Sequence, residues 1–244
     1  MSANLQSSID GLYRVFARYP LNLRMEACSC CVDTRTFSDL FDGELRELEQ
    51  SQLVHFASKA ATTWGTVDDY RHFLPRILEL MTQEVPLDFG LEPWLQARRL
   101  RYTRWFDWPI EEREAVEAFW RSWFLVIVKA PPPTENYDGP WAEDLVQAIG
   151  VLGLSIKPML VEWAAAGVEG AQHIAGAVRG LDAYGRCNHL WESAAARDEF
   201  EEWIRDDERL VQLWEAIPLT SDPLVLEESI RLLGEFPPLK SSSG

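Results

Sequence analysis

The stretch TTWGTVDDYRHFLPRILELM, residues 62–81, carries the clearest helical pattern in the chain. The Thr66 hydroxyl can accept a hydrogen bond from the Asp69 amide while the Asp69 carboxylate reaches back, which is a variant of the capping box. Apolar residues then recur at spacings of three and four. This pattern predicts a helix over 67–81 whose apolar side faces a core and includes Val67, Tyr70, Phe73, Leu74, Ile77, Leu78 and Met81.

Pro75 interrupts this helical pattern. A proline cannot donate to the carbonyl of Arg71, and its ring crowds that carbonyl. The sequence therefore predicts a kink or a break near Leu74.

The polar side of the same segment combines carboxylates, an imidazole and guanidinium groups at spacings that bring them onto one helix face. We interpret this face as a contact surface for a protein partner. The alternative is an ordinary solvated helix face, on which mixed charges are common. The predicted contact residues are Trp64, Asp68, Asp69, Arg71, His72 and Arg76.

Three of the four cysteines lie in the run CSCC, residues 28–31. Cys28 and Cys31 have the separation typical of a zinc-binding pair, but no second such pair follows. A metal site would then consist of Cys28, Cys30 and Cys31 with His72, although His55 or Cys187 could also complete it. Thiol–disulfide exchange and unreactive reduced thiols are the alternatives.

The runs ATTWGTVDDYRHFLPRILEL, residues 61–80, and CSCC, residues 28–31, resemble stretches of an uncharacterised family of bacterial all-helical proteins. The resemblance covers at most the first third of the chain, and it implies no activity. It implies only that the cysteine run and the helix after it belong to one shared feature.

Composition predicts an all-α protein, because residues of low strand propensity fill the periodic windows and no series of alternating strands is present. The formal net charge is −16 among 244 residues, which makes nucleic-acid binding unlikely. Arginines interleaved with aromatic residues over 98–104 leave a single-stranded nucleic acid as a weak alternative. Eleven tryptophans supply large side chains, most of which we expect in the core.

Neither a spanning helix nor a signal peptide is predicted. No stretch of about 18 residues is apolar without a charge, and residues 1–10 lack a basic start followed by an apolar run. We therefore expect a cytoplasmic protein without membrane contact.

The prolines at 131–133 mark a predicted subdomain boundary. We expect an N-terminal helical subdomain over 1–130, a proline-rich linker over 131–140, a C-terminal helical subdomain over 141–236 and a disordered tail over 237–244. Helical segments joined by short breaks favour antiparallel hairpins stacked in a solenoid-like α-α superhelix.

Motifs of common enzyme classes are absent from the sequence. It contains no GxGxxG, no P-loop, no HExxH and no GxSxG. The favoured interpretation is a helical interaction or scaffold protein that is not an obvious enzyme and needs no cofactor. The alternative is a zinc-like or thiol-redox site on the loop 28–31 with His72. Neither the partner nor the oligomeric state can be read from the sequence.

Overall fold

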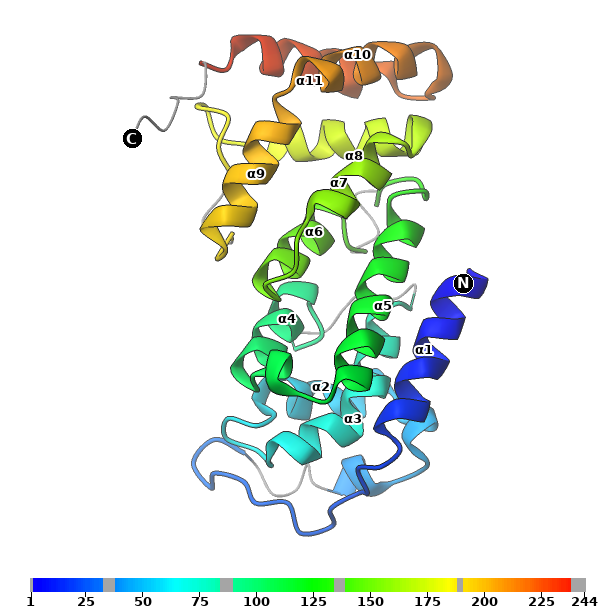
Figure 1. The fold of residues 1–244 in the computed structure, drawn as a ribbon, viewed down its shortest axis with the longest axis vertical. Helices are drawn as coiled ribbons and strands as arrows, with labels where there is room; N and C mark the ends of the chain where they lie inside the picture. The colour runs from blue at the N-terminus through cyan, green and yellow to red at the C-terminus, as the bar shows by residue number, and fades with distance from the viewer. Residues whose placement is uncertain (1, 33–37, 84–89, 134–138, 188–190, 238–244) are drawn as a thin grey trace. The chain divides into compact units, whose positions relative to one another are not determined.

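The computed structural model describes residues 2–32, 38–83, 90–133, 139–187 and 191–237 (Figure 1). These residues form eleven α-helices and several short 3-10 helices, and contain no strand beyond isolated bridges. The predicted all-α class is confirmed. The chain divides into two compact units, Met1–Trp123 with Thr134–Gly139 and Phe124–Pro133 with Pro140–Gly244. Half of the predicted linker and nearly all of the predicted tail, residues 134–138 and 238–244, lie outside the described residues.

The first unit, unit 1, is built around α3, which contacts both α1 and α2 (Figure 1). The Phe56 ring of α2 lies 4.8 Å from Phe73 of α3 and 5.6 Å from Trp64 between centroids. Burial of these rings supplies much of the apolar area that holds the unit together. The described helices are α1 (Ala3–Phe16), η2 (Ser38–Phe41), η3 (Leu45–Glu47), α2 (Gln50–Lys59), α3 (Val67–Met81), α4 (Pro93–Tyr102), η4 (Trp105–Asp107) and α5 (Ile110–Ile127), which begins in this unit.

The capping prediction for α3 is confirmed. Of the kink or break predicted near Leu74, the break is not present. Asp69 N donates to Thr66 Oγ1 at 3.2 Å, while the Asp69 carboxylate accepts from Thr66 N at 2.7 Å. The helix nevertheless runs without interruption through Pro75 to Met81. Pro75 and the neighbouring Leu74 are both buried, so packing on this side offsets the lost backbone hydrogen bond.

The second unit, unit 2, is built around α8, which contacts α10 and α11. The buried Ser229 hydroxyl donates to the Ala175 carbonyl at 3.1 Å and thereby links α11 to α8. Trp163 packs against Phe200 and Trp203 at centroid distances of 6.0 and 5.2 Å. Its helices are α6 (Ala142–Val151), α7 (Lys157–Ala164), α8 (Gly167–Gly180), α9 (Ala194–Ile204), α10 (Asp207–Ala216), η5 (Ile217–Leu219) and α11 (Pro223–Glu235), together with the end of α5.

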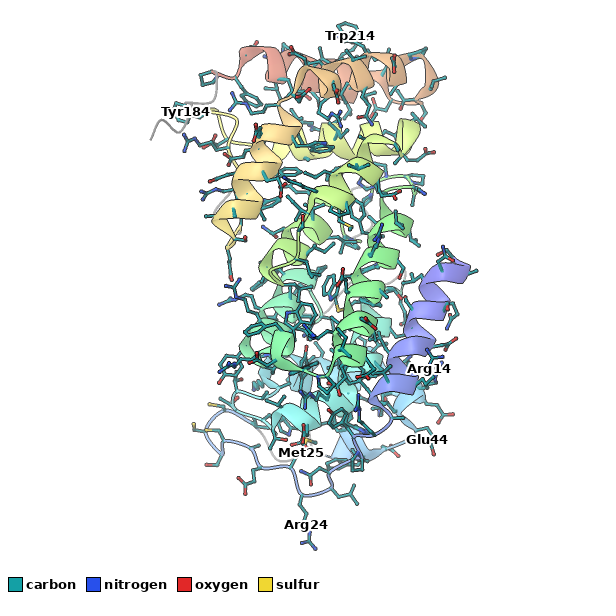
Figure 2. All side chains as sticks on the ribbon, in the orientation of Figure 1. Arg14, Arg24, Met25, Glu44, Tyr184 and Trp214 are labelled. Atoms are coloured by element: carbon teal, nitrogen blue, oxygen red, sulfur yellow. The ribbon has the colours of Figure 1, made fainter. Side chains whose placement is uncertain are left out.

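Most tryptophans are buried, as the composition predicted. The buried set consists of Trp64, Trp105, Trp108, Trp120, Trp123, Trp163 and Trp191. Trp214 is the clear exception, since 59% of its surface is exposed and its side chain projects away from the ribbon (Figure 2). None of the described helices combines the length and the apolar character needed to cross a bilayer.

Candidate functional site

The cysteine loop is fixed to the turn between α2 and α3. The Cys28 amide donates to the Thr63 carbonyl, and the Gly65 amide donates to the Glu26 carbonyl, both at 2.8 Å. These bonds form an antiparallel bridge between Ala27 and Trp64. The cysteine run and the segment before α3 therefore form one local substructure.

A tight turn within the loop brings the three sulfurs together. The amides of Cys31 and Val32 both donate to the Cys28 carbonyl at 3.0 Å. The Lys59 ammonium, at the end of α2, donates to the Cys31 carbonyl. The backbone of the loop is thus held from within and from α2, while its thiols stay near the surface.

The thiols of Cys28, Cys30 and Cys31 lie within 4.8 Å of one another. Cys30 Sγ is 2.8 Å from Cys28 Sγ and 3.4 Å from Cys31 Sγ. Hydrogen bonding from Cys30 lowers the pKa of Cys28 to about 7, and the same bond raises the pKa of Cys30 to about 11. Cys28 therefore carries a substantial thiolate fraction at neutral pH, and Cys30 acts as the donor.

This donor set fits a soft metal ion. A zinc–sulfur bond of about 2.3 Å places two tetrahedral sulfur ligands about 3.8 Å apart. The two shorter sulfur distances must therefore open by about 1 Å or less when an ion binds. Cys30 and Cys31 are exposed and Cys28 is half-buried, so an ion can reach all three sulfurs from solvent.

His72 does not join the thiols in the structure. Its Nδ1 lies 2.8 Å from the Tyr19 carbonyl oxygen, and its ring packs edge-on against Phe73. Among the described residues, the group of clustered metal-ligand atoms around the loop consists of the three thiols alone. The predicted four-ligand set is therefore reduced to Cys28, Cys30 and Cys31.

Three predicted partner-contact residues are interior, which corrects their interpretation. Trp64 is 1% exposed, Asp69 is 4% exposed and Arg76 is 9% exposed. Asp69 completes the capping box with Thr66, and Arg76 donates to the Leu48 carbonyl at 2.7 Å and to Glu79 at 2.6 Å. These side chains stabilise unit 1 and are not available to a partner.

Arg71 also faces inward, whereas Asp68 is exposed. Arg71 bonds to Asp68 at 3.0 Å, and its Nε lies 3.4 Å from the buried carboxylate of Glu112. Glu112 additionally accepts from the Tyr19 hydroxyl at 2.7 Å and pairs with Arg18 at 3.0 Å. The predicted partner surface is thus largely an internal polar network.

The sequence interpretation missed this role of Glu112. Its position in the first turn of α5 accounts for a favourable interaction with the helix dipole but not for these pairings. A signal was present, because Glu112 precedes the buried Val116 and Phe119 at spacings of four and seven and so shares their helix face. A carboxylate on a buried stripe needs charged or hydrogen-bonding partners.

Comparisons with protein-family models, curated protein sequences and solved structures find no match to this chain.

Proposed function

We propose that the protein binds a soft metal ion through Cys28, Cys30 and Cys31. The observation that carries the proposal is the clustering of three surface thiols on a loop fixed by backbone hydrogen bonds. Sulfur ligands favour zinc and other soft ions over magnesium or calcium. Three cysteines leave the fourth position of a tetrahedral zinc ion to water or to an external ligand.

Protonation controls this site. Cys28 supplies the first thiolate near neutral pH, because its pKa is about 7. Cys30, with a pKa near 11 in the free protein, releases its proton when the ion binds. Metal affinity should therefore rise with pH across the neutral range.

Elemental analysis and zinc titration of the purified protein test the proposal. We expect about one ion per chain, with the three loop thiols protected from a thiol reagent. Cys28→Ser and Cys31→Ser should lose the ion, whereas Cys187→Ser, which changes a cysteine of unit 2, should keep it. The proposal is wrong if added zinc leaves the three loop thiols reactive.

The same titration separates metal binding from thiol-redox chemistry. A redox role predicts no retained ion, together with the loss of two titratable thiols after mild oxidation and their return after reduction. The reducing environment of the cytoplasm, where we place the protein, keeps the thiols available for either chemistry.

A second proposed function is that of a helical interaction or scaffold module. Its support is the exposure of large apolar side chains on α10, η5 and α11, since such side chains often mark contact surfaces. In this proposal the antiparallel hairpins stack in a solenoid-like arrangement, and the partner is a protein. The exposed set consists of Val211, Trp214, Leu219 and Leu224.

Partner capture with paired variants tests this second function. Val211→Ser combined with Trp214→Ser should abolish retention of a specific protein, whereas Leu23→Ser, at an exposed position in unit 1, should not. Equal retention by the two variants would contradict a contact surface on α10. An experimental structure in which successive hairpins do not pack on one another would contradict the solenoid-like arrangement.

A further inference from the structure

The cysteine loop offers three sulfur ligands, from Cys28, Cys30 and Cys31, and no fourth ligand atom joins them among the described residues. The Nδ1 of His72 lies instead 2.8 Å from the Tyr19 carbonyl oxygen. A structural zinc ion takes four ligands. A trivalent arsenic or antimony atom forms three bonds and keeps a lone pair on its fourth side. The number of clustered thiols therefore matches a trivalent element.

The spacing of the sulfurs also favours a trivalent element. Cys30 Sγ lies 2.8 Å from Cys28 Sγ and 3.4 Å from Cys31 Sγ. Tetrahedral zinc holds two sulfurs about 3.8 Å apart. The lone pair of a trivalent atom compresses the angles between its three bonds below the tetrahedral value, so the sulfurs around it lie closer together. A pyramidal complex therefore requires less opening of these two pairs than a tetrahedral one.

The backbone of the loop is already arranged for three bonds. The Cys28 carbonyl accepts from the amides of Cys31 and Val32, both at 3.0 Å, and the Cys28 amide donates to the Thr63 carbonyl at 2.8 Å. Because these hydrogen bonds hold the backbone that carries the thiols, binding orders mainly side chains, and the entropic cost of binding is reduced. Cys30 and Cys31 are exposed, so the ligand can enter from solvent.

We propose that Cys28, Cys30 and Cys31 bind trivalent arsenic or antimony, supplied as the hydroxide, as a complex of three thiolates. The inference rests on the proposed soft-metal site and names the class of element that this site takes. Three bonds form between sulfur and the central atom, and three bonds between that atom and hydroxide oxygens break. Each thiol proton leaves with a hydroxide as water. No electrons are transferred, so the reaction needs no oxidant or reductant.

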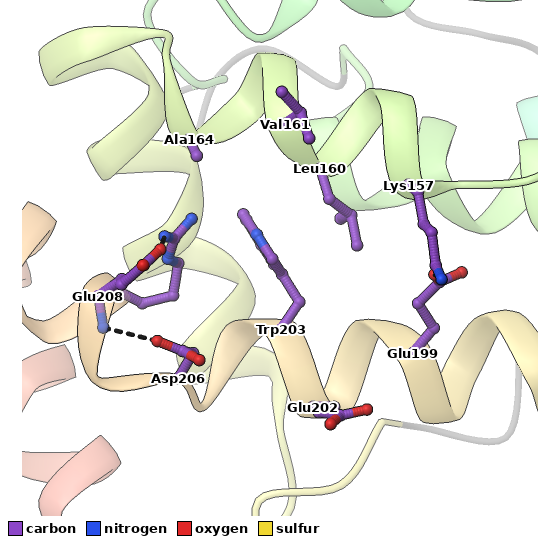
Figure 3. Close-up of a pocket in the computed structure, with 10 residues that line it drawn as sticks. Lys157, Leu160, Val161, Ala164, Glu199, Glu202, Trp203, Asp206 and Glu208 are labelled. Carbon is purple, nitrogen blue, oxygen red and sulfur yellow. Dashed lines mark hydrogen bonds and ion pairs between the residues drawn. The ribbon is translucent and has the colours of Figure 1, made fainter.

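A pocket of unit 2, shown in Figure 3, is a second place where an added ion can bind. It lies between α7 and α9, and its lining includes the carboxylates of Glu199, Glu202, Asp206 and Glu208. Carboxylate oxygens suit hard cations and do not suit a thiophilic element. In the described part of the chain, no three of these carboxylates lie close enough together to hold one ion. Glu202→Gln, which removes an exposed carboxylate of this lining, therefore serves as a control that should leave binding unchanged.

Titration of the full chain with sodium arsenite tests the proposal. We expect about one arsenic per chain after gel filtration, with three of the four cysteines protected from a thiol reagent. The ultraviolet absorption of arsenic–sulfur bonds should grow in step with this protection. Loop thiols that stay reactive at saturating arsenite, or protection of only two thiols, overturn the proposal.

A parallel zinc titration separates this inference from the proposed function. Protection of the loop thiols by zinc without binding of arsenite overturns the inference alone. Failure of both zinc and arsenite to protect these thiols overturns the soft-metal site as well. Protection by arsenite alone supports the inference and removes zinc from the ions that the site takes.

Single serine variants test whether all three sulfurs take part. Cys28→Ser, Cys30→Ser and Cys31→Ser each leave two loop thiols, and each should weaken arsenite binding about tenfold or more. Phenylarsine oxide, which forms only two bonds to sulfur, should still bind these variants, and its retention shows that the loop remains folded and reactive. Cys187→Ser, in unit 2, should change neither affinity. Unchanged arsenite affinity in any of the three loop variants contradicts a complex of three thiolates.

Discussion

Arg71 lies over the indole ring of Trp108, with its guanidinium carbon 4.4 Å from the ring centroid. Arg71 belongs to the first half of α3, and Trp108 lies two residues before the start of α5. The contact joins two segments that are far apart in sequence, and Glu112 reinforces it from the buried side. A cation over an aromatic ring contributes about 1 kcal/mol or more when it is partly desolvated.

Replacing Glu112 should destabilise unit 1. Glu112→Gln removes the negative charge with which Arg18 and Arg71 both pair. The mostly buried Arg71 then lacks a buried carboxylate as its partner. We expect a loss of about 3 kcal/mol in the free energy of unfolding, measured by urea denaturation. The control is Asp107→Asn, which breaks the exposed pair with Arg104 and should cost less than about 1 kcal/mol. Similar losses in both variants would contradict the role assigned to Glu112.

Two helical glycines should respond oppositely to the same substitution. A Cβ at Gly176 would lie 2.1 Å from the Trp141 ring, so Gly176→Ala forces that ring to move and should destabilise by about 1–3 kcal/mol. A Cβ at Gly234 meets no atom within 4 Å, so Gly234→Ala should stabilise by up to about 1 kcal/mol. Thermal unfolding of both variants checks the prediction, which fails if Gly176→Ala raises the midpoint.

His173 should make the protein less stable in acid. It is buried, with Nε2 facing the carbonyls of Ile127 and Ala130, and burial lowers its pKa to about 4. Between pH 6.5 and 4 the unfolded chain binds a proton that the folded state does not. The stabilising contribution is therefore complete above pH 6.5, and about 3 kcal/mol of it is lost by pH 4.

Urea unfolding at several pH values, compared with His173→Gln, isolates this effect. The comparison with the variant is needed because Glu143 changes the pH dependence of stability in the opposite direction. Desolvation raises the pKa of Glu143 to about 7, so its contribution is complete at low pH and declines as pH rises to 7. An unchanged difference between wild type and variant from pH 7 to pH 4 would contradict the prediction.

Cys28 should be the most readily alkylated thiol at neutral pH. Its labelling rate with iodoacetamide should rise most steeply near pH 7, where it ionises. Cys30→Ala removes the hydrogen bond that lowers this pKa and should move the midpoint upward by one unit or more. Cys187 provides an internal reference, because burial raises its pKa and should keep it slow. A midpoint that stays near 7 in Cys30→Ala would refute the assigned cause.

Local signals explain what could be predicted from the sequence. The Thr66 cap and the periodic apolar residues of α3 depend on neighbours within a few positions, and both predictions are confirmed. The clustering of Cys28, Cys30 and Cys31 is equally local, because one turn brings the sulfurs together.

Long-range pairing explains what could not be predicted. The polar side of α3 was expected to face a partner, yet Arg71 meets Glu112 and Arg76 meets the Leu48 carbonyl. Nothing in the spacing of these residues reveals such distant partners.

Because of the bridge between Ala27 and Trp64, the fluorescence of Trp64 can report on the cysteine loop. Trp64 is fully enclosed and adjoins the backbone that carries Cys28, so a change in the loop alters the surroundings of a single indole. Binding of a metal ion to the three loop thiols should therefore shift or quench the fluorescence emission of this tryptophan. Comparison with Trp64→Phe would separate its signal from that of the other ten tryptophans and allow metal uptake to be followed in real time.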